Sequence, residues 1–248
     1  MTAKEETNSI QKTARIAGVL ILIMAVIAPF SMLYIPSTLI VPGDAAATAN
    51  NMMASQSLFR LGIASDYVVL LLEILISVLL YVIVRPVSKT LALVVLVSRL
   101  AMTVIQGINL LNHFIALLLV SGAGYLTVFD PGQLQALVLL FLNVHQNVVL
   151  IWGVAFSLHL FVLGYLVYKS GYIPKFVGVL LVIASLCYLI QDFGTVLFPN
   201  NAATFAMVGI LSTVEIALPL WLVIKGVNTE QWEKRALESA RIVPTPVG

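Results

Sequence analysis

The sequence predicts an all-α membrane protein: a polytopic transmembrane helix bundle of about six spans with both termini in the cytoplasm. Of the 248 residues, 60% are apolar and only 10% are charged, whereas soluble domains are about 45–50% apolar and about 25% charged. The mean hydropathy is +1.05. The net charge of +2 gives no electrostatic basis for binding nucleic acid.

The spans follow from the lengths of the apolar runs, since about 20 mostly apolar residues cross about 30 Å of hydrocarbon. Runs of sufficient length are found at 14–35, 59–84, 90–120, 134–168, 174–197 and 204–225. The third and fourth are longer than a crossing needs, so we expect those helices to tilt or to extend beyond the bilayer. The predicted organisation is an N-terminal tail (1–13), a transmembrane domain (14–226) and a C-terminal tail (227–248).

The distribution of Lys and Arg predicts the orientation. With the N terminus inside, 11 of the 13 basic residues lie on the cytoplasmic side and the loops 36–58, 121–133 and 198–203 face outward. The pattern predicts a multi-pass membrane protein, whose surroundings are the lipid bilayer. The sequence leaves open a homo-oligomer or a partner membrane subunit.

Short helices are also predicted outside the spans. Asp44 is a plausible N-cap for a surface helix leading into the second span, and Asp130 followed by Pro131 marks a similar start before the fourth. For the C-terminal tail two interpretations are open. The segment 228–241 either forms a short amphipathic helix on the inner surface, with Trp232 on its apolar face, or is a solvated tail.

Counting residues from the inner end of each span places four ionisable residues at a common depth in the membrane. Glu73 lies twelve residues from the basic inner end of its span, and Arg99, His159 and Glu215 lie ten residues from theirs. At 1.5 Å per residue, all four are about 15–18 Å from the inner edge, near the bilayer midplane. We call these four residues the midplane cluster and predict that they form a binding site.

Arg99 is the only basic side chain in the midplane cluster that is always ionised. An unpaired charge at that depth costs about 2.5–3.5 kcal/mol on insertion scales, so we expect Arg99 to pair with Glu73 or Glu215. The less well paired acid is then able to carry a proton near neutral pH, which is the chemistry of a proton-coupled site. A static ion pair that locks helix packing is an equally open alternative.

A polar face continues from the midplane toward the outer side. Arg99, Gln106 and His113 recur every seven residues on the third span, so they share one helix face. Other polar residues lie in the outer halves of the neighbouring spans. We predict that these residues line an outward-opening vestibule and call them the outer polar residues: Asp66, Gln106, Asn109, His113, His145 and Asp192.

Two of these histidines raise the alternative of a bound metal. By residue counting, His113 and His145 lie at similar depths on consecutive spans. They could therefore share a haem iron or, together with Asp66 or Asp192, bind a zinc ion. The sequence has no local ligand spacing such as H-x-x-x-H, and hydrogen-bonded packing is the commoner role of such histidines. We therefore predict no metal and no cofactor.

The sequence also lacks Walker A, G-x-G-x-x-G, G-x-S-x-G and H-E-x-x-H motifs. Nucleotide hydrolysis, dinucleotide binding, elbow-type serine hydrolysis and zincin proteolysis therefore have no support from motifs.

The segment 163–181, LGYLVYKSGYIPKFVGVLL, resembles the most recognisable stretch of an uncharacterised bacterial membrane family, domain of unknown function 4386. The segments 58–66 and 14–18 resemble other landmarks of that family, so the resemblance covers roughly residues 12–226. It implies a multi-helix inner-membrane protein and supplies no activity, cofactor or catalytic residue. Physically, Gly171 permits a left-handed turn after one helix and Pro174 can start the next.

Three functions remain open from the sequence. The first is a binding or transport protein that admits a small solute or a proton to the midplane cluster. The second is a structural or sensory subunit whose buried charges only fix packing, in which case exchanging Glu73 and Arg99 preserves fold and function. The third is an intramembrane enzyme or a haem- or metal-binding protein, the enzyme using His145 or His159 with Asp66 or Asp192 as acid and base.

Overall fold

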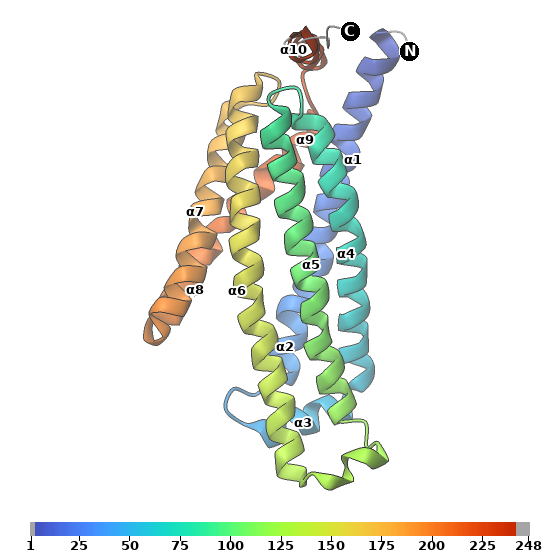
Figure 1. Cartoon of the computed structure of the whole chain (residues 1–248), viewed down its shortest axis with the longest axis vertical. Helices are drawn as coiled ribbons and strands as arrows, with labels where there is room; N and C mark the ends of the chain where they lie inside the picture. Colours follow the sequence, from blue (N-terminus) through green and yellow to red (C-terminus); the bar gives the residue numbers. More distant parts are fainter. Residues whose placement is uncertain (1–2, 242–248) are drawn as a thin grey trace, which may run out of the picture. The chain divides into compact units, whose positions relative to one another are not determined.

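The computed structural model describes the backbone of residues 3–241 and the side chains of residues 9–240. Within this part the regular structure is helical, and six stretches are long and apolar enough to cross a membrane (Figure 1). They are Ser9–Leu39, Gln56–Val84, Lys89–Leu119, Pro131–Ser170, Lys175–Leu197 and Pro199–Ile224. Each overlaps one predicted span, so the all-α, six-span prediction is confirmed. Residues 1–2 and 242–248, at the ends of the two predicted tails, lie outside the described part.

The chain forms two compact units. Unit 1 comprises Met1–Leu22, Glu73–Met102 and Gly153–Gly248, and unit 2 comprises Ile23–Leu72 and Thr103–Trp152. All four residues of the midplane cluster belong to unit 1, as do all the basic residues except Arg60. The outer polar residues belong to unit 2, with the exception of Asp192.

Unit 1 is built from one end of four long helices and from the C-terminal helices. The long helices are α1 (Ala3–Pro29), α4 (Gln56–Val84), α5 (Lys89–Leu119) and α6 (Pro131–Ser170), and the others are α7 (Lys175–Leu197), α8 (Ala202–Ile210), α9 (Ala217–Ile224) and α10 (Thr229–Arg241). The 40 residues of α6 extend about 60 Å, about twice the length that a crossing needs. The helix of the fourth span is therefore longer than a membrane crossing requires, as predicted.

Hydrogen bonds at one end of unit 1 join the start of α1, the end of α4, the end of α6 and the C-terminal segment. We call it the basic end because Lys12, Arg85, Lys169 and Lys225 lie in or beside these segments. The side-chain amide of Gln11 donates to the carbonyl of Lys225 and accepts from the backbone N–H of Val227, both at 3.0 Å. The start of α1 and the link from α9 to α10 therefore meet at the same end of unit 1.

The C-terminal segment forms the helix α10 and not a solvated tail, and α10 docks at the basic end of unit 1. The indole N–H of Trp232 donates to the carbonyl of Ile83 at 2.9 Å, and the hydroxyl of Tyr172 donates to the same carbonyl at 2.8 Å. Ile83 lies in the last turn of α4, where carbonyl groups have no partner within the helix. Trp232, only 5% exposed, therefore anchors α10 while it caps α4.

Replacing Trp232 with alanine is expected to release α10. The substitution removes a buried indole, whose loss costs about 3–5 kcal/mol in protein cores, and also the hydrogen bond to Ile83. Because α10 carries Lys234 and Arg235, limited trypsin digestion of the detergent-purified protein measures the release. We expect cleavage after these residues to accelerate at least about tenfold. The matched control is Leu237→Ala on the same helix, because Leu237 is 64% exposed. Equal cleavage rates in both variants would contradict this docking.

A glycine contact joins α6 to α7. A Cβ atom placed on Gly178 would lie 2.6 Å from the carbonyl oxygen of Gly164 and 2.6 Å from the backbone nitrogen of Tyr168. Between the helices Gly171 has φ +79°, the left-handed region that glycine enters without steric penalty. The predicted turn is confirmed, with Pro174 as the N-cap of α7 and not as its first residue.

The sixth span is interrupted, whereas the sequence pattern indicated one continuous helix over 204–225. After η3 (Pro199–Asn201) and α8, the chain forms the 3₁₀ segment η4 (Leu211–Ile216) before α9. Pro219 explains the change, because proline lacks an N–H for the carbonyl four residues earlier and its ring clashes with that carbonyl. The residue four positions earlier is Glu215. The hydroxyls of Ser212 and Thr213 donate to the carbonyls of Gly209 and Ile210 and thereby satisfy part of the unwound backbone.

Unit 2 contains the remaining parts of the long helices and four short elements. The first span continues through the π-helical η1 (Phe30–Tyr34) and α2 (Ile35–Leu39), and η2 (Gly124–Val128) precedes α6. The predicted surface helix is α3 (Ala45–Ala54), and the carboxylate of Asp44 accepts from the backbone N–H of Ala47 as its N-cap. Before α6, Gln133 Oε1 accepts from the backbone N–H of Asp130, which completes the predicted helix start.

The core of unit 2 lies where these elements pack together. It consists of buried aliphatic and aromatic side chains from α2, α3, α4, α5 and α6, with Leu39, Met52, Phe59 and Leu142 among them. Met52 on the short helix α3 is completely buried. The segment between the first two spans is therefore packed into the unit.

Candidate functional site

The centre of the candidate site is an ion pair between α4 and α5. Arg99 Nε lies 2.6 Å from Glu73 Oε2, and the two residues are only 3% and 5% exposed. The pair joins two helices that are consecutive in the chain. Its full burial means that each charge depends on the other, since neither is solvated by water.

His159 on α6 extends this pair and is completely buried. Its Nδ1 lies 2.9 Å from the carbonyl oxygen of Val95, and its Nε2 lies 3.1 Å from Arg99 Nη1. A carbonyl only accepts and a guanidinium only donates. The geometry therefore requires the neutral tautomer with the proton on Nδ1, so that Nε2 accepts from Arg99.

Glu215, the fourth member of the midplane cluster, lies in η4 and is half-buried. Its Oε1 accepts a hydrogen bond of 3.2 Å from the hydroxyl of Tyr188 on α7. Arg99 and Glu73 are near enough to act electrostatically on Glu215. Unit 1 thus brings all four residues of the midplane cluster into one neighbourhood, with Glu73 in the ion pair and Glu215 hydrogen-bonded to a neutral phenol.

Two aromatic residues complete this neighbourhood, and the prediction from sequence omitted them as site residues. The guanidinium of Arg99 lies 5.8 Å from the ring centroid of Phe156, and Phe156 packs edge-on against Tyr188 at 5.2 Å. Phe156 is three residues before His159, so both lie on one face of α6. Tyr188 shares a face of α7 with Asp192, a pattern visible in the sequence.

Asp192 differs from the other predicted outer polar residues in belonging to unit 1. It is 3% exposed, and its Oδ2 has no hydrogen-bond partner among the described residues. A Cβ atom on Gly153 would overlap this carboxylate, so the absence of a side chain at Gly153 makes room for it. Asp192 also acts electrostatically on Tyr188, one helical turn away.

In unit 2, His113 and His145 stack face to face. Their ring centroids are 3.6 Å apart at an interplanar angle of 21°, and the edge of Phe59 contacts His113. Asn109 joins this stack, since its side-chain amide donates to the carbonyl of His145 at 3.0 Å. In such a stack the ring nitrogens of the two imidazoles lie in nearly parallel planes and point past one another. This arrangement is a poor one for two axial ligands of one haem iron, which must face each other across the metal.

The remaining outer polar residues are also buried in unit 2. Asp66 Oδ1 lies 2.5 Å from the hydroxyl of Ser31, which belongs to the π-helical segment η1. Gln106 is 8% exposed. Arg99, Gln106 and His113 are all buried, in agreement with the polar helix face that their spacing of seven predicted.

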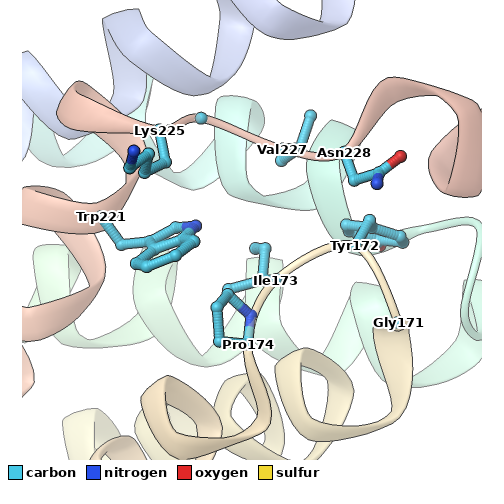
Figure 2. A pocket seen from close by; sticks show the side chains of 9 residues that line it. Gly171, Tyr172, Ile173, Pro174, Trp221, Lys225, Val227 and Asn228 are labelled. Carbon is cyan, nitrogen blue, oxygen red and sulfur yellow. The ribbon is translucent and has the colours of Figure 1, made fainter.

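Metal ligands do not gather in the described part of the chain: no group of three or more His, Cys, Asp or Glu side chains there could hold a metal ion. Cys187 is a buried free thiol. A pocket of about 370 Å³ lies at the basic end of unit 1 (Figure 2), and none of the ten predicted site residues lines it.

Comparisons with known proteins agree with the resemblance seen in the sequence. The model of the family described as domain of unknown function (DUF4386) matches residues 16–226. An uncharacterized protein of Archaeoglobus fulgidus is 29% identical over 165 residues, which are 66% of this chain and 83% of that protein. No solved structure matches the chain. The range matched by the family model includes all ten predicted site residues and ends before α10.

Proposed function

The chain belongs to the family described as domain of unknown function (DUF4386), and we propose that it is a multi-pass membrane protein that binds and releases a proton at Glu215. In this proposal the proton is one ligand of a transport or sensing cycle, and a small polar solute is the other. The single observation that carries the proposal is the position of Glu215 in the interrupted sixth span.

An interrupted span provides two properties that a proton site needs. Unwound segments in membranes occur where backbone is buried in protein or lines a polar path, and transporters place ion sites at such breaks. A 3₁₀ stretch within a helix also often marks a hinge. The carboxyl group of Glu215 is therefore on a segment whose geometry can change, close to the fixed charge of Arg99.

Asp192 and Tyr188 provide a route for the proton in this proposal. Asp192 and Tyr188 are four residues apart on α7, and the hydroxyl of Tyr188 donates to Glu215. Residues four apart share a helix face. A carboxyl, a phenol and a second carboxyl thus follow one another from the outer part of α7 toward Arg99, and each can give or take a proton.

The Glu73–Arg99–His159 group has a fixed role in this proposal. Arg99 keeps its charge at every physiological pH, and Glu73 compensates it directly. A proton that leaves Glu215 produces a carboxylate near this guanidinium. Arg99 therefore stabilises the carboxylate form of Glu215, so that in this proposal Glu215 can release its proton as well as bind it.

A structural role is the second candidate function, and a specific observation favours it. Glu73, Arg99 and His159 are almost completely buried and satisfy one another. Polar groups of this kind join transmembrane helices in many bundles. In that case the midplane cluster determines helix packing, and Glu215 exchanges no proton.

The orientation follows the positive-inside rule in our proposal. The basic end of unit 1, with the start of α1 and the link from α9 to α10, faces the cytoplasm, and the acidic residues Asp44 and Asp130 face outward. The resemblance to the bacterial membrane family supports the bacterial inner membrane as the membrane of this proposal.

Substitution of Glu215 with glutamine is expected to abolish the buried proton uptake. Glutamine keeps the size of the side chain and still accepts from Tyr188, but it binds no proton in the physiological range. Infrared difference spectra of the reconstituted protein at two pH values measure the uptake as a carboxyl C=O band. This measurement requires no knowledge of the solute.

The control for this measurement is Glu230→Gln, because Glu230 is an exposed carboxylate on α10. We expect the band of a carboxyl group shielded from water in the wild type and in Glu230→Gln, and its loss in Glu215→Gln. The same band in all three proteins would overturn the assignment of the proton to Glu215. Tyr188→Phe is expected to shift the band, since it removes the hydrogen bond to Glu215.

A further inference from the structure

We propose that the pocket at the basic end of unit 1 binds the phosphate headgroup of an anionic membrane lipid. The pocket has a volume of about 370 Å³ and lies between the α6–α7 turn and the link from α9 to α10 (Figure 2). A water molecule occupies about 30 Å³ in the liquid, so the pocket has room for a group of about a dozen waters. This size suits a phosphate ester with a small alcohol and is at the lower limit of ligand sites.

Three of the residues that line the pocket, Trp221, Lys225 and Asn228, carry side-chain hydrogen-bond donors. The indole nitrogen of Trp221 is directed toward the other lining residues, and the ammonium group of Lys225 lies at the edge of the pocket (Figure 2). Asn228 uses its Oδ1 to accept from the backbone N–H of Gln231, so its side-chain NH₂ remains for a ligand. No acidic side chain lines the pocket. Phosphate oxygens only accept, so this set of donors and this charge fit an anionic phosphate.

The shape of the pocket is fixed by the same residues that join the C-terminal helices. The backbone N–H of Asn228 donates to the carbonyl of Tyr172, and Gly226 at φ +70° turns the chain. Tyr172 is buried and hydrogen-bonded to α4, and burial raises the pKa of its hydroxyl. Its phenol therefore stays neutral and leaves Lys225 as the charged group that lines the pocket.

The surface beside the pocket indicates a lipid and not a soluble ligand. Phe176 packs edge-on against Trp221, with ring centroids 5.9 Å apart, and is 54% exposed. Ile224, which directly precedes Lys225, is 66% exposed. Both belong to apolar stretches that can cross a membrane. A lipid with its phosphate in the pocket can therefore extend its acyl chains along α7 and α9.

Other basic residues at this end add to the attraction for anionic lipids. Lys175 follows Pro174 of the pocket wall and lies over the ring of Tyr168 at 5.5 Å. Arg235 donates to the carbonyl of Lys169 at 3.0 Å. Basic sites between helices near the membrane surface are typical binding sites for lipid phosphates.

Lipid exchange in nanodiscs tests this proposal. The full-length protein is placed in nanodiscs of phosphatidylcholine mixed with phosphatidylglycerol, and native mass spectrometry measures the phosphatidylglycerol that stays bound. We expect the wild type to retain phosphatidylglycerol in preference to phosphatidylcholine. Lys225→Gln is expected to weaken the retention of phosphatidylglycerol about tenfold, the usual effect of losing a hydrogen bond to a charged group.

Two further variants complete the experiment. Trp221→Phe keeps an aromatic ring but removes the indole N–H, and we expect it to weaken retention about threefold. Lys234→Gln is the matched control, because it removes one exposed charge on α10 at the same end of the unit, and it is expected to have no effect. If Lys225→Gln fails to fold, Trp221→Phe alone tests the pocket.

Two results would contradict the proposal. Equal retention of phosphatidylglycerol by the wild type, Lys225→Gln and Trp221→Phe would overturn the proposal. Glycerol 3-phosphate added to the lipid-free protein in detergent distinguishes the source of the phosphate. If it stabilises the protein against heat as well as phosphatidylglycerol does, the pocket binds a soluble phosphate ester and the assignment to a lipid is wrong.

Discussion

Replacing Arg99 with methionine is expected to lower the free energy of unfolding by about 3–5 kcal/mol, the usual effect of removing one partner from a buried ion pair. The variant leaves the carboxylate of Glu73 without its counter-ion and Nε2 of His159 without its donor. Both atoms are buried, so water cannot replace the guanidinium. Unfolding of the detergent-purified protein by denaturant measures the change.

Arg85→Met is the matched control for charge and size, because Arg85 is exposed at the end of α4. We expect its effect to be within about 0.5 kcal/mol, as for most surface substitutions. An Arg99→Met variant as stable as Arg85→Met would contradict the ion pair.

The double variant Glu73→Gln/Arg99→Met separates the two candidate functions. Neutralising both partners of a buried pair is often nearly neutral for stability, so we expect the double variant to recover most of the loss. If the midplane cluster only fixes packing, the recovered protein resembles the wild type in every property. If Arg99 stabilises the deprotonated Glu215, the double variant is stable and its proton uptake at Glu215 is changed.

Depth along each helix could be predicted from the sequence, because the helical rise is constant and the basic residues mark one end of each span. This argument selected Glu73, Arg99, His159 and Glu215, which the structure brings into one neighbourhood. Which acid pairs with Arg99 could not be predicted, since that depends on the rotation of each helix about its axis. The structure pairs Arg99 with Glu73 on the preceding helix and adds His159 as an acceptor.

The interruption of the sixth span had a signal in the sequence. Pro219 stands four residues after Glu215, and proline is known to disturb the carbonyl at that distance. Hydropathy alone does not contain this information, because an apolar run has the same hydropathy whether its backbone is α-helical or 3₁₀. The partners of the outer polar residues were unpredictable for another reason. The stack of His113 on His145 and the contact of Ser31 with Asp66 join residues from different helices, and spacing within one helix says nothing about them.

Replacing Gly178 with alanine is expected to lower the free energy of unfolding by about 3 kcal/mol, at the upper end of the usual range for overpacking. The added methyl group would lie 2.6 Å from a backbone oxygen of α6 and 2.6 Å from a backbone nitrogen. Side chains can rotate away from such a contact, but backbone atoms cannot. The α6–α7 hairpin must therefore open, and its opening also displaces Tyr172 from the end of α4. Thermal unfolding in detergent measures the loss.

The comparison with Gly132→Ala distinguishes this contact from a general effect of removing glycine. Gly132 lies in the first turn of α6, and nothing is within 4 Å of a Cβ atom placed there. Alanine is favoured over glycine within helices by roughly 0.5–1 kcal/mol, so Gly132→Ala is expected to be neutral or stabilising. The same substitution is thus expected to be destabilising at Gly178 and not at Gly132, because only Gly178 has backbone atoms where the methyl group would lie. Equal effects at both positions would show that α6 and α7 do not pack through these glycines.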